Sequence, residues 1–296
     1  MSAQNPAVTA RVALVTCAEL PHLDEDESVP IAPLAARGIA AEPAVWNDRS
    51  VDWDVYDLAI IRSTWDYTDH HAEFVAWAET VPRLANPADV VRWNSDKTYL
   101  RDLAAAGVPV VPTIWIEPDS TLTLPNDGRY VVKPAISAGS RNTGLYDMAD
   151  ASQRALAAGL ATQLLAEGRT VMVQPYLEAV DTAGETAVLF VGGHYSHAIR
   201  KGALLDGPAD EVGLYKVEDI RPRTASDSEL HAAQLALAAV PGGAERLLYA
   251  RVDLIPGPDG HPVLLELELT EPSLFLRYDE GAAERFADAV AAYLKR

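Results

Sequence analysis

Cysteine is nearly absent from this sequence, since Cys17 is the only one in 296 residues. A disulfide within the chain and a cysteine-rich metal site are therefore excluded. Because Cys17 follows the apolar run 12–15, we expect it to be a buried small hydrophobic side chain rather than a nucleophile.

Basic residues are also scarce. The chain has 24 lysines and arginines against 43 aspartates and glutamates, which gives a net charge of -19 and a pI near 4.6. Such an acidic protein repels polyanions at long range, so nucleic acid and anionic membranes are not expected as partners. Any phosphate site must then be made locally positive by a few basic side chains and metal ions.

Long apolar runs are missing too, and none approaches the roughly 20 residues that span a bilayer. The first residues lack the basic region and apolar core of a secretory signal, so we expect a cytoplasmic protein. What is present is an ordinary globular composition, 49% hydrophobic and 23% charged. The length predicts about two domains.

The stretch 130–144 is the one around which we organise the chain. It reads Tyr-Val-Val-Lys-Pro-Ala-Ile-Ser-Ala-Gly-Ser-Arg-Asn-Thr-Gly. Lys133 lies in a β-prone run that Pro134 is expected to end, which places a cation at a strand end. The small polar residues 137–144 follow, and their glycines let backbone N–H groups turn toward an anion.

This loop is not a Walker A motif. Gly139 and Gly144 have the G-x-x-x-x-G spacing, but Leu145 and Tyr146 stand where lysine and serine or threonine are required. Another strand is expected at 145–148, which favours a β-loop-β flap over a nucleotide triphosphate. A mobile surface hairpin is the alternative.

Residues 11–110 alternate between strand-like and helix-like segments. Strands are expected at 12–16, 44–46 and 58–61, with a helix that begins near Ser28 and ends at Gly38. This pattern predicts a small α/β domain with a mostly parallel sheet, whose ligands lie beyond the carboxyl ends of the strands.

The loop after the third strand is dense in recognition groups. Arginine can pair bidentately with a carboxylate, while hydroxyls and aromatic rings supply donors and walls. We therefore expect a substrate-binding role for Arg62, Ser63, Thr64, Trp65 and Tyr67. The alternative is that Arg62 makes an interdomain ion pair and Trp65 anchors the core.

Two other charged segments are ambiguous. The acidic cluster 24–27 could hold an ammonium group, but carboxylates near a helix N-terminus are favoured by the helix dipole in any case, and we prefer that interpretation. Lys97 stands in the first turn of a helix expected at 96–106, where a cation opposes the dipole. A bound anion would explain it, and a solvated lysine is the alternative.

Pro175 interrupts an apolar strand expected at 171–177 and leaves backbone groups unpaired. Gln174, Pro175, Tyr176 and Leu177 could thereby bind the edge of adenine, and Asp181 could accept a ribose hydroxyl. The alternative is a plain strand end.

A hairpin is expected at 186–200, with Gly192 and Gly193 at its turn. Its second strand ends in Arg200 and Lys201, which places two cations at a sheet edge. Ser226 and Glu229 then predict a capping box for a helix that runs to Ala239.

The last pattern is the most informative. Strands at 247–255 and 262–269 should pair antiparallel, and alternation places Arg251 and Asp253 on one face and Glu266 and Glu268 on the same face of the partner. Leu265, Leu267 and Leu269 should point into the core. Three hard oxygen ligands suit Mg²⁺ better than zinc. The alternative is a half-solvated face.

These motifs, in this order, resemble the ATP-grasp superfamily near its glutathione-synthetase-like branch. The resemblance covers essentially the whole chain and implies an N-terminal α/β domain at 1–110, a lid subdomain at 111–184 and a C-terminal subdomain with the metal site at 185–296. It implies an α/β (α+β ATP-grasp) fold in which the last two parts clasp the nucleotide.

The resemblance also implies roles for the residues. ATP would be held by Lys97, Lys133, the loop with Ser137, Gly139, Ser140, Arg141 and Gly144, the segment 174–177 and Asp181. Two Mg²⁺ ions would be bound by Asp253, Glu266 and Glu268, and the catalytic cations would be Arg200, Lys201 and Arg251. The loop has less glycine than most relatives, and Glu268 replaces the usual asparagine.

The N-terminal half is similar to a narrower group, the O-ureido-serine cyclo-ligases of D-cycloserine biosynthesis. This likeness implies activation of the O-ureido-D-serine carboxylate as an acyl phosphate, followed by ring closure onto the substrate's own nitrogen. The expected partner is thus a small amino-acid-like carboxylate, and a homodimer is an option. The alternatives are ligation of a carboxylate to a separate amine, and a non-catalytic ATP-binding protein.

Overall fold

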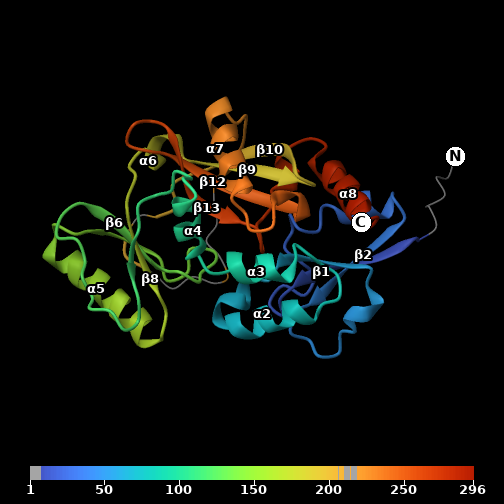
Figure 1. Ribbon diagram of the computed structural model, residues 1–296, viewed down its shortest axis with the longest axis horizontal. Helices are drawn as coiled ribbons and strands as arrows, with labels where there is room; N and C mark the ends of the chain where they lie inside the picture. Colours follow the sequence, from blue (N-terminus) through green and yellow to red (C-terminus); the bar gives the residue numbers. More distant parts are fainter. Residues whose placement is uncertain (1–7, 206, 210–213, 215–218) are drawn as a thin grey trace.

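The computed structural model describes residues 8–205, 207–209, 214 and 219–296. These residues form three sheets, of which one is parallel and two are antiparallel. Figure 1 shows β6, β8 and α5 at one end, β1 and β2 at the other, and β9, β12 and β13 between them. The mixed α/β class expected from the sequence is confirmed.

The N-terminal sheet has the strand order β2-β1-β3-β4. Its elements are β1 (Ala10–Thr16), α1 (Ile31–Ala35), β2 (Ile39–Val45), η1 (Trp53–Val55), β3 (Leu58–Ser63), η2 (Trp65–Asp69), α2 (His71–Thr80) and β4 (Leu84–Ala85). β3 is buried along its whole length because both of its faces are covered. Cys17 is 0% exposed, as expected.

The second sheet is small and carries one long helix. After α3 (Ala88–Asn94) and α4 (Tyr99–Ala105), the elements are β5 (Ile114–Ile116), β6 (Arg129–Pro134), β7 (Gly144–Asp147), α5 (Ala151–Ala166) and β8 (Val171–Pro175). α5 packs its buried alanines and Leu164 on this sheet. Pro134 ends β6 as expected, since it is the last residue of the strand, where it pairs with Val171.

The third sheet has the order β11-β10-β9-β12-β13. Its elements are α6 (Val180–Ala183), β9 (Glu185–Val191), β10 (His194–Lys201), β11 (Ile220–Arg223), α7 (Asp227–Ala238), η3 (Ala244–Arg246), β12 (Tyr249–Pro256), β13 (Pro262–Glu268), η4 (Leu276–Tyr278) and α8 (Ala282–Tyr293). The capping box of Ser226 and Glu229 at α7 is confirmed. So is the β9–β10 hairpin, with Gly192 and Gly193 at positive φ.

One register detail differs from the expectation. The β12–β13 ladder pairs Asp253 with Glu266 but Leu254 with Leu264, so Leu265 is the extra residue of a bulge. Leu264 therefore takes the core position with Leu267 and Leu269, while Leu265 faces the cavity described below. The bulge thus turns an expected core leucine into a cavity wall.

The first and third sheets share one core. α8 packs Phe286 and Val290 in a cluster that holds Leu14 of β1 and Leu189 of β9. The three sheets fall within 1–110, 111–184 and 185–296, and we retain that division into domains as a proposal. No helix in the described part of the chain is long and apolar enough to span a membrane.

Candidate active site

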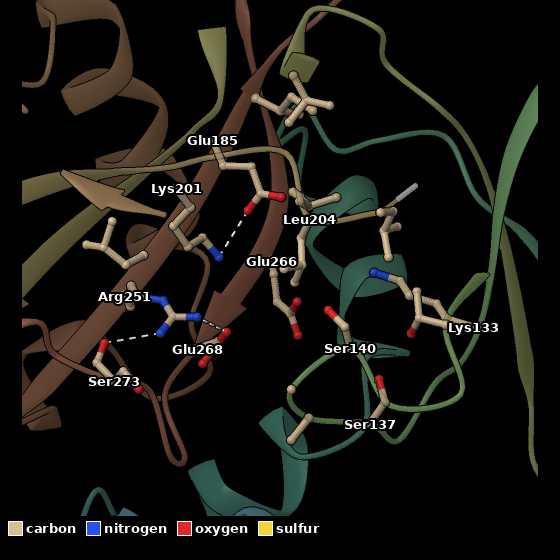
Figure 2. A pocket seen from close by; sticks show the side chains of 18 of the residues that line it. Lys133, Ser137, Ser140, Glu185, Lys201, Leu204, Arg251, Glu266, Glu268 and Ser273 are labelled. Carbon is tan, nitrogen blue, oxygen red and sulfur yellow. Dashed lines mark hydrogen bonds and ion pairs between the residues drawn. The ribbon is translucent and has the colours of Figure 1, made fainter. Parts of the chain in front are cut away.

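A cavity of about 490 Å³ is lined by residues from all three parts of the chain. Cations and carboxylates face each other across it, as Figure 2 shows for Lys133 on one side and Lys201, Arg251 and Glu268 on the other. Such a volume is typical of a small-molecule site. The sequence analysis placed Lys133 and Glu266 in one site as a hypothesis, and both residues line this cavity.

Lys133 is the cation whose environment points to a ligand. Its side chain comes from β6 and is 8% exposed, and it makes no hydrogen bond or ion pair with any residue that the structure describes. Burial lowers the pKa of Lys133 overall, and the nearby Lys97 and Lys201 ammonium groups add to this, while Glu266 and Glu185 act in the opposite direction. An anionic ligand would relieve both effects.

Lys97 lies on the same wall, just before α4. Its Nζ is 2.7 Å from Glu266 Oε1 and donates to the carbonyl oxygen of Ser137 at 2.5 Å. Burial lowers the pKa of Lys97, but the carboxylates, Glu266 first among them, outweigh burial and raise it overall. The lysine therefore links the loop 137–144 to the carboxylates of β13.

The loop places part of its residues at the cavity. Ser137, Gly139 and Ser140 line it, and the last two have φ near 60°. Arg141 points away, because its guanidinium binds Asp69 Oδ2 at 2.8 Å and Thr68 Oγ1 at 3.1 Å in η2. Gly144 is not in the lining either, since it is the first residue of β7 and pairs with Val132.

The segment 174–177 lines the far end of the cavity together with apolar side chains. Gln174 donates to Thr113 Oγ1 at 2.9 Å, so its amide is already fixed. Asp181 lies outside the lining and accepts a hydrogen bond from the Tyr176 hydroxyl. Glu185, the first residue of β9, lines the cavity instead, 3.0 Å from Lys201 Nζ.

The three expected metal ligands are engaged by cations. Lys201 Nζ is 2.7 Å from Asp253 Oδ2, and Arg251 Nε is 3.0 Å from Asp253 Oδ1. Arg251 also pairs with Glu268 (Figure 2). Glu266 and Glu268 line the cavity, whereas Asp253 lies behind Lys201 and Arg251 and is 1% exposed.

The electrostatics of these carboxylates disfavour ionisation of all three groups at once. Burial raises the pKa of Glu268 to about 8, and Glu266 and Asp253 add to the rise against the effect of Arg251. Burial also opposes ionisation of Glu266, but Lys97 and Lys133 outweigh it and lower its pKa overall. The donor set therefore fits a hard divalent cation. The three groups do not offer oxygens within 4.8 Å of one another in this conformation, in which Glu266 pairs with Lys97 and Glu268 with Arg251.

Arg200 is placed away from the cavity. It alternates with Lys201 along β10, so the two side chains lie on opposite faces of the strand. Its guanidinium donates to the carbonyl oxygens of Ala183 at 2.7 Å and Thr182 at 3.0 Å, at the end of α6. The role expected for Arg200 at the phosphoryl group therefore fits Lys201, and we withdraw it for Arg200.

In the loop after β3, Trp65 alone reaches the cavity, with its Nε1 donating to the Glu271 carbonyl at 3.1 Å. Arg62 is 0% exposed and donates from Nε to Glu27 Oε2 and from Nη2 to the Pro272 carbonyl, both at 2.5 Å. Ser63, Thr64 and Tyr67 are buried behind the cavity wall. Arg62 thus forms an ion pair instead of the expected contact with a substrate carboxylate, but its partner Glu27 belongs to the same N-terminal part, and only the bond to Pro272 reaches the third part.

Sequence reasoning missed Glu271, Ser273, Phe275, Arg277 and Tyr278, which line the cavity from the segment that follows β13. Asp24, Glu25 and Asp26 of the acidic cluster after β1 also line the cavity, although the helix-dipole interpretation was preferred for that cluster. Asp26 accepts from Arg277 Nε at 3.2 Å, which joins the two segments. The sequence did carry one signal for these residues, because both segments follow the carboxyl end of a strand.

Comparisons with known proteins identify the family of this chain. A family model described as the N-terminal domain of D-cycloserine synthetase DcsG matches residues 12–86. The cycloserine biosynthesis protein DcsG of Streptomyces lavendulae is 40% identical over 301 residues, covering 96% of this chain and 99% of that protein. The chain belongs to the D-cycloserine synthetase DcsG family.

Solved structures support the same assignment. A crystal structure of D-cycloserine synthetase DcsG superposes on this chain with a TM-score of 0.83 and 38% identity, covering 96% of this chain and 99% of that one. A RimK domain ATP-grasp protein of Sphaerobacter thermophilus has a TM-score of 0.64 at 18% identity over 95% of this chain and 100% of its own, which supports the fold alone. This member of the DcsG family is an ATP-grasp ligase, and the fold class and enzyme class expected from the sequence are confirmed.

Proposed function

We propose that this ligase uses ATP to activate the carboxylate of O-ureido-D-serine as an acyl phosphate and then closes the ring to give D-cycloserine. The observation that carries the proposal is the single cavity that gathers Lys97, Lys133, Lys201 and Arg251 around the carboxylates of β13. The family named for D-cycloserine synthesis supplies the substrate class.

Phosphoryl transfer asks a protein mainly to position the reactants and to neutralise charge. Lys133 and Lys97 would bind the triphosphate beneath Ser137, Gly139 and Ser140. The apolar end near Tyr176 and Leu177 would hold the adenine, and Glu185 takes over the ribose role first expected of Asp181. Lys201 and Arg251 would face the transferred group.

Two Mg²⁺ ions are proposed at Asp253, Glu266 and Glu268, where they would supply charge neutralisation for the triphosphate. Binding there requires Lys97 and Arg251 to release the glutamates that they hold in this conformation. The triphosphate would then pair with Lys97 and Arg251 in place of the two glutamates, so each cation keeps an anionic partner.

The chemistry balances as follows. The substrate carboxylate takes the γ-phosphoryl group, and the nitrogen bound to oxygen then displaces phosphate to form the ring. Loss of the carbamoyl group from that nitrogen consumes one water and releases carbon dioxide and ammonia. The intermediate acyl phosphate hydrolyses readily, so the loop 137–144 must exclude water while it exists.

The test uses O-ureido-D-serine labelled with ¹⁸O in its carboxylate. We expect D-cycloserine and ADP to form, with one ¹⁸O appearing in inorganic phosphate. ADP formation without label transfer would rule out the acyl phosphate. A product that requires a second amine would instead favour a ligase that joins two molecules.

Variants test the residues. Glu266→Gln should abolish Mg²⁺-dependent ADP release while circular dichroism shows a folded protein, and unchanged turnover would remove the metal assignment. Lys133→Ala should weaken ATP binding in calorimetry, and wild-type affinity would remove β6 from the nucleotide site.

A cytoplasmic location and a homodimer stay predictions from the sequence.

A further inference from the structure

Glu271 lies on the cavity wall directly after β13, three residues beyond Glu268. Its side chain is 8% exposed. Trp65 of η2 fixes its backbone by donating from Nε1 to its carbonyl oxygen at 3.1 Å, and the Tyr67 hydroxyl of η2 acts on its carboxylate by lowering the pKa of Glu271. The group is thus buried, oriented and open to the cavity.

Glu271 differs from the other carboxylates of the cavity in its partners. Glu266 pairs with Lys97, Glu268 with Arg251, and Glu185 with Lys201. Glu25 and Asp26 both pair with Arg277, and Asp24 also has a partner of its own. Glu271 makes no ion pair with any residue that the structure describes.

Ring closure needs a proton acceptor. The nitrogen that attacks the acyl phosphate carries a hydrogen, and no histidine of the described chain lines the cavity. A carboxylate bound to a cation is a poor base, because the cation stabilises its ionised form. Glu271, which is buried in the wall and makes no ion pair with a described residue, is therefore the candidate.

We propose that Glu271 is the base that accepts the proton of the attacking ureido nitrogen during ring closure. The inference rests on the proposed function and adds a catalytic residue to it. The nitrogen lone pair forms the new C–N bond, the bond from the acyl carbon to the phosphate oxygen breaks with its electron pair leaving on phosphate, and the N–H proton passes to the Glu271 carboxylate.

The electrostatic setting agrees with this role. Burial raises the pKa of Glu271 to about 7, and Glu266 adds to the rise, while Lys97, the Tyr67 hydrogen bond and Arg251 act in the opposite direction. A base whose pKa lies near the working pH is well suited to proton transfer. The facing groups are Tyr67 from η2, Lys97 before α4, Tyr249 and Arg251 from β12, and Glu266 from β13.

The first experiment compares Glu271→Gln with the wild type and with Glu73→Gln, an exposed glutamate of α2. Rapid-quench assays would follow ADP and D-cycloserine in the first turnover. We expect Glu271→Gln to keep the first-turnover ADP and to lose ring closure by about 10²- to 10⁴-fold, the usual worth of a general base. Loss of ADP formation as well, or a change confined to KM, would mean that Glu271 binds substrate instead, and the proposal would fail.

The second experiment is a pH profile of ring closure. The wild-type rate should rise with pH through about 7, because the base must be ionised. Tyr67→Phe removes the hydroxyl that lowers the pKa of Glu271, so the rise should move to higher pH. A merely structural role for Tyr67 would change stability and leave the midpoint in place, which would contradict the proposal.

The two proposals fail differently. If the wild type forms no ADP with O-ureido-D-serine, the proposed function is wrong. If the wild type makes D-cycloserine and Glu271→Gln does so at the same rate, only the assignment of Glu271 is wrong.

Discussion

Arg62 shows that burial determines the role of a charged residue. The guanidinium stacks over the Tyr249 ring, 4.9 Å from its centroid, and its partner Glu27 is buried to the same degree. A buried ion pair has lost its hydration, so each charge depends on the other. The pair joins β3 to the loop after β1, and the bond from Arg62 to the Pro272 carbonyl extends the contact to the segment after β13, which lines the cavity.

Removing one member of this pair should be costly. Arg62→Ala leaves Glu27 buried without a counter-ion, and we expect a loss of about 3–5 kcal/mol in the free energy of unfolding. Urea denaturation measures it. The matched control is Arg11→Ala, whose pair with Glu42 is about half exposed and should cost at most about 1 kcal/mol. Equal losses for the two variants would contradict the argument.

At the scale of elements, the loop 137–144 is tied to two neighbours. Arg141 joins it to η2 through Asp69, and the adjoining strand β7 receives the segment 207–209, since Leu145 N donates to the Gly207 carbonyl at 2.7 Å. η2 also presents Trp65 to the cavity. The loop 137–144 and the Trp65 side of the cavity are therefore linked through η2.

Asp69→Ala should loosen the loop without touching the cavity. The ion pair is partly exposed, so its loss, about 0.2–1 kcal/mol, should weaken ATP binding by up to about fivefold. The acyl phosphate should also leak to water, which raises the ratio of ADP to D-cycloserine. Arg37→Ala, which breaks a pair with α8, is the control and should leave that ratio at the wild-type value. A wild-type ratio in both variants would count against the loop tether.

Gly144→Ala tests the contact with the segment 207–209. A Cβ on Gly144 would lie 2.5 Å from the backbone nitrogen of Ala209 and from the Tyr146 hydroxyl, so the segment must shift. We expect a loss of about 1–3 kcal/mol in thermal unfolding. Gly159→Ala in α5 meets nothing within 4 Å and should instead stabilise the helix by about 0.5–1 kcal/mol. The opposite order of the two variants would refute this packing.

At the scale of the whole molecule, two asparagines join the N-terminal part to the third sheet. Asn86 donates to the carbonyls of Tyr249 and Leu269 and accepts from Leu248 N, at 2.7–2.9 Å. Asn94 likewise donates to the Leu267 carbonyl and accepts from Leu269 N. These bonds and the core shared with α8 should make the two parts unfold together.

Asn86→Ala strips partners from three buried backbone groups, each worth about 1–3 kcal/mol when left unsatisfied. We expect a loss of at least about 2 kcal/mol, and hydrogen exchange should show β1, β3, β9 and β12 losing protection together. The sheet of β5 to β8 should keep its own exchange rate until ATP is added. Separate loss of protection in β1 and β12 would argue against one cooperative unit.

Much of the molecule could be predicted from the sequence because the signals were local. The β9–β10 hairpin follows from Gly192-Gly193, the start of α7 from its capping box, and the β12–β13 pairing from strand alternation. The cavity positions of Lys97, Lys133, Glu266 and Glu268 follow from the same alternation and from strand and helix ends. Even so, one bulge was enough to move Leu265 from the core to the cavity.

The sequence by itself determined which strands and helices form and which of their side chains share a face, because backbone geometry fixes these over a few residues. Only the tertiary structure decided which charges meet: Arg62 with Glu27, Arg200 with the end of α6, and Glu271 with Tyr67 and no cation. Those partners lie up to about two hundred residues apart, as Tyr67 and Glu271 do, and nothing local specifies them. Their ionisation depends on burial, which exists only once the three sheets have packed together.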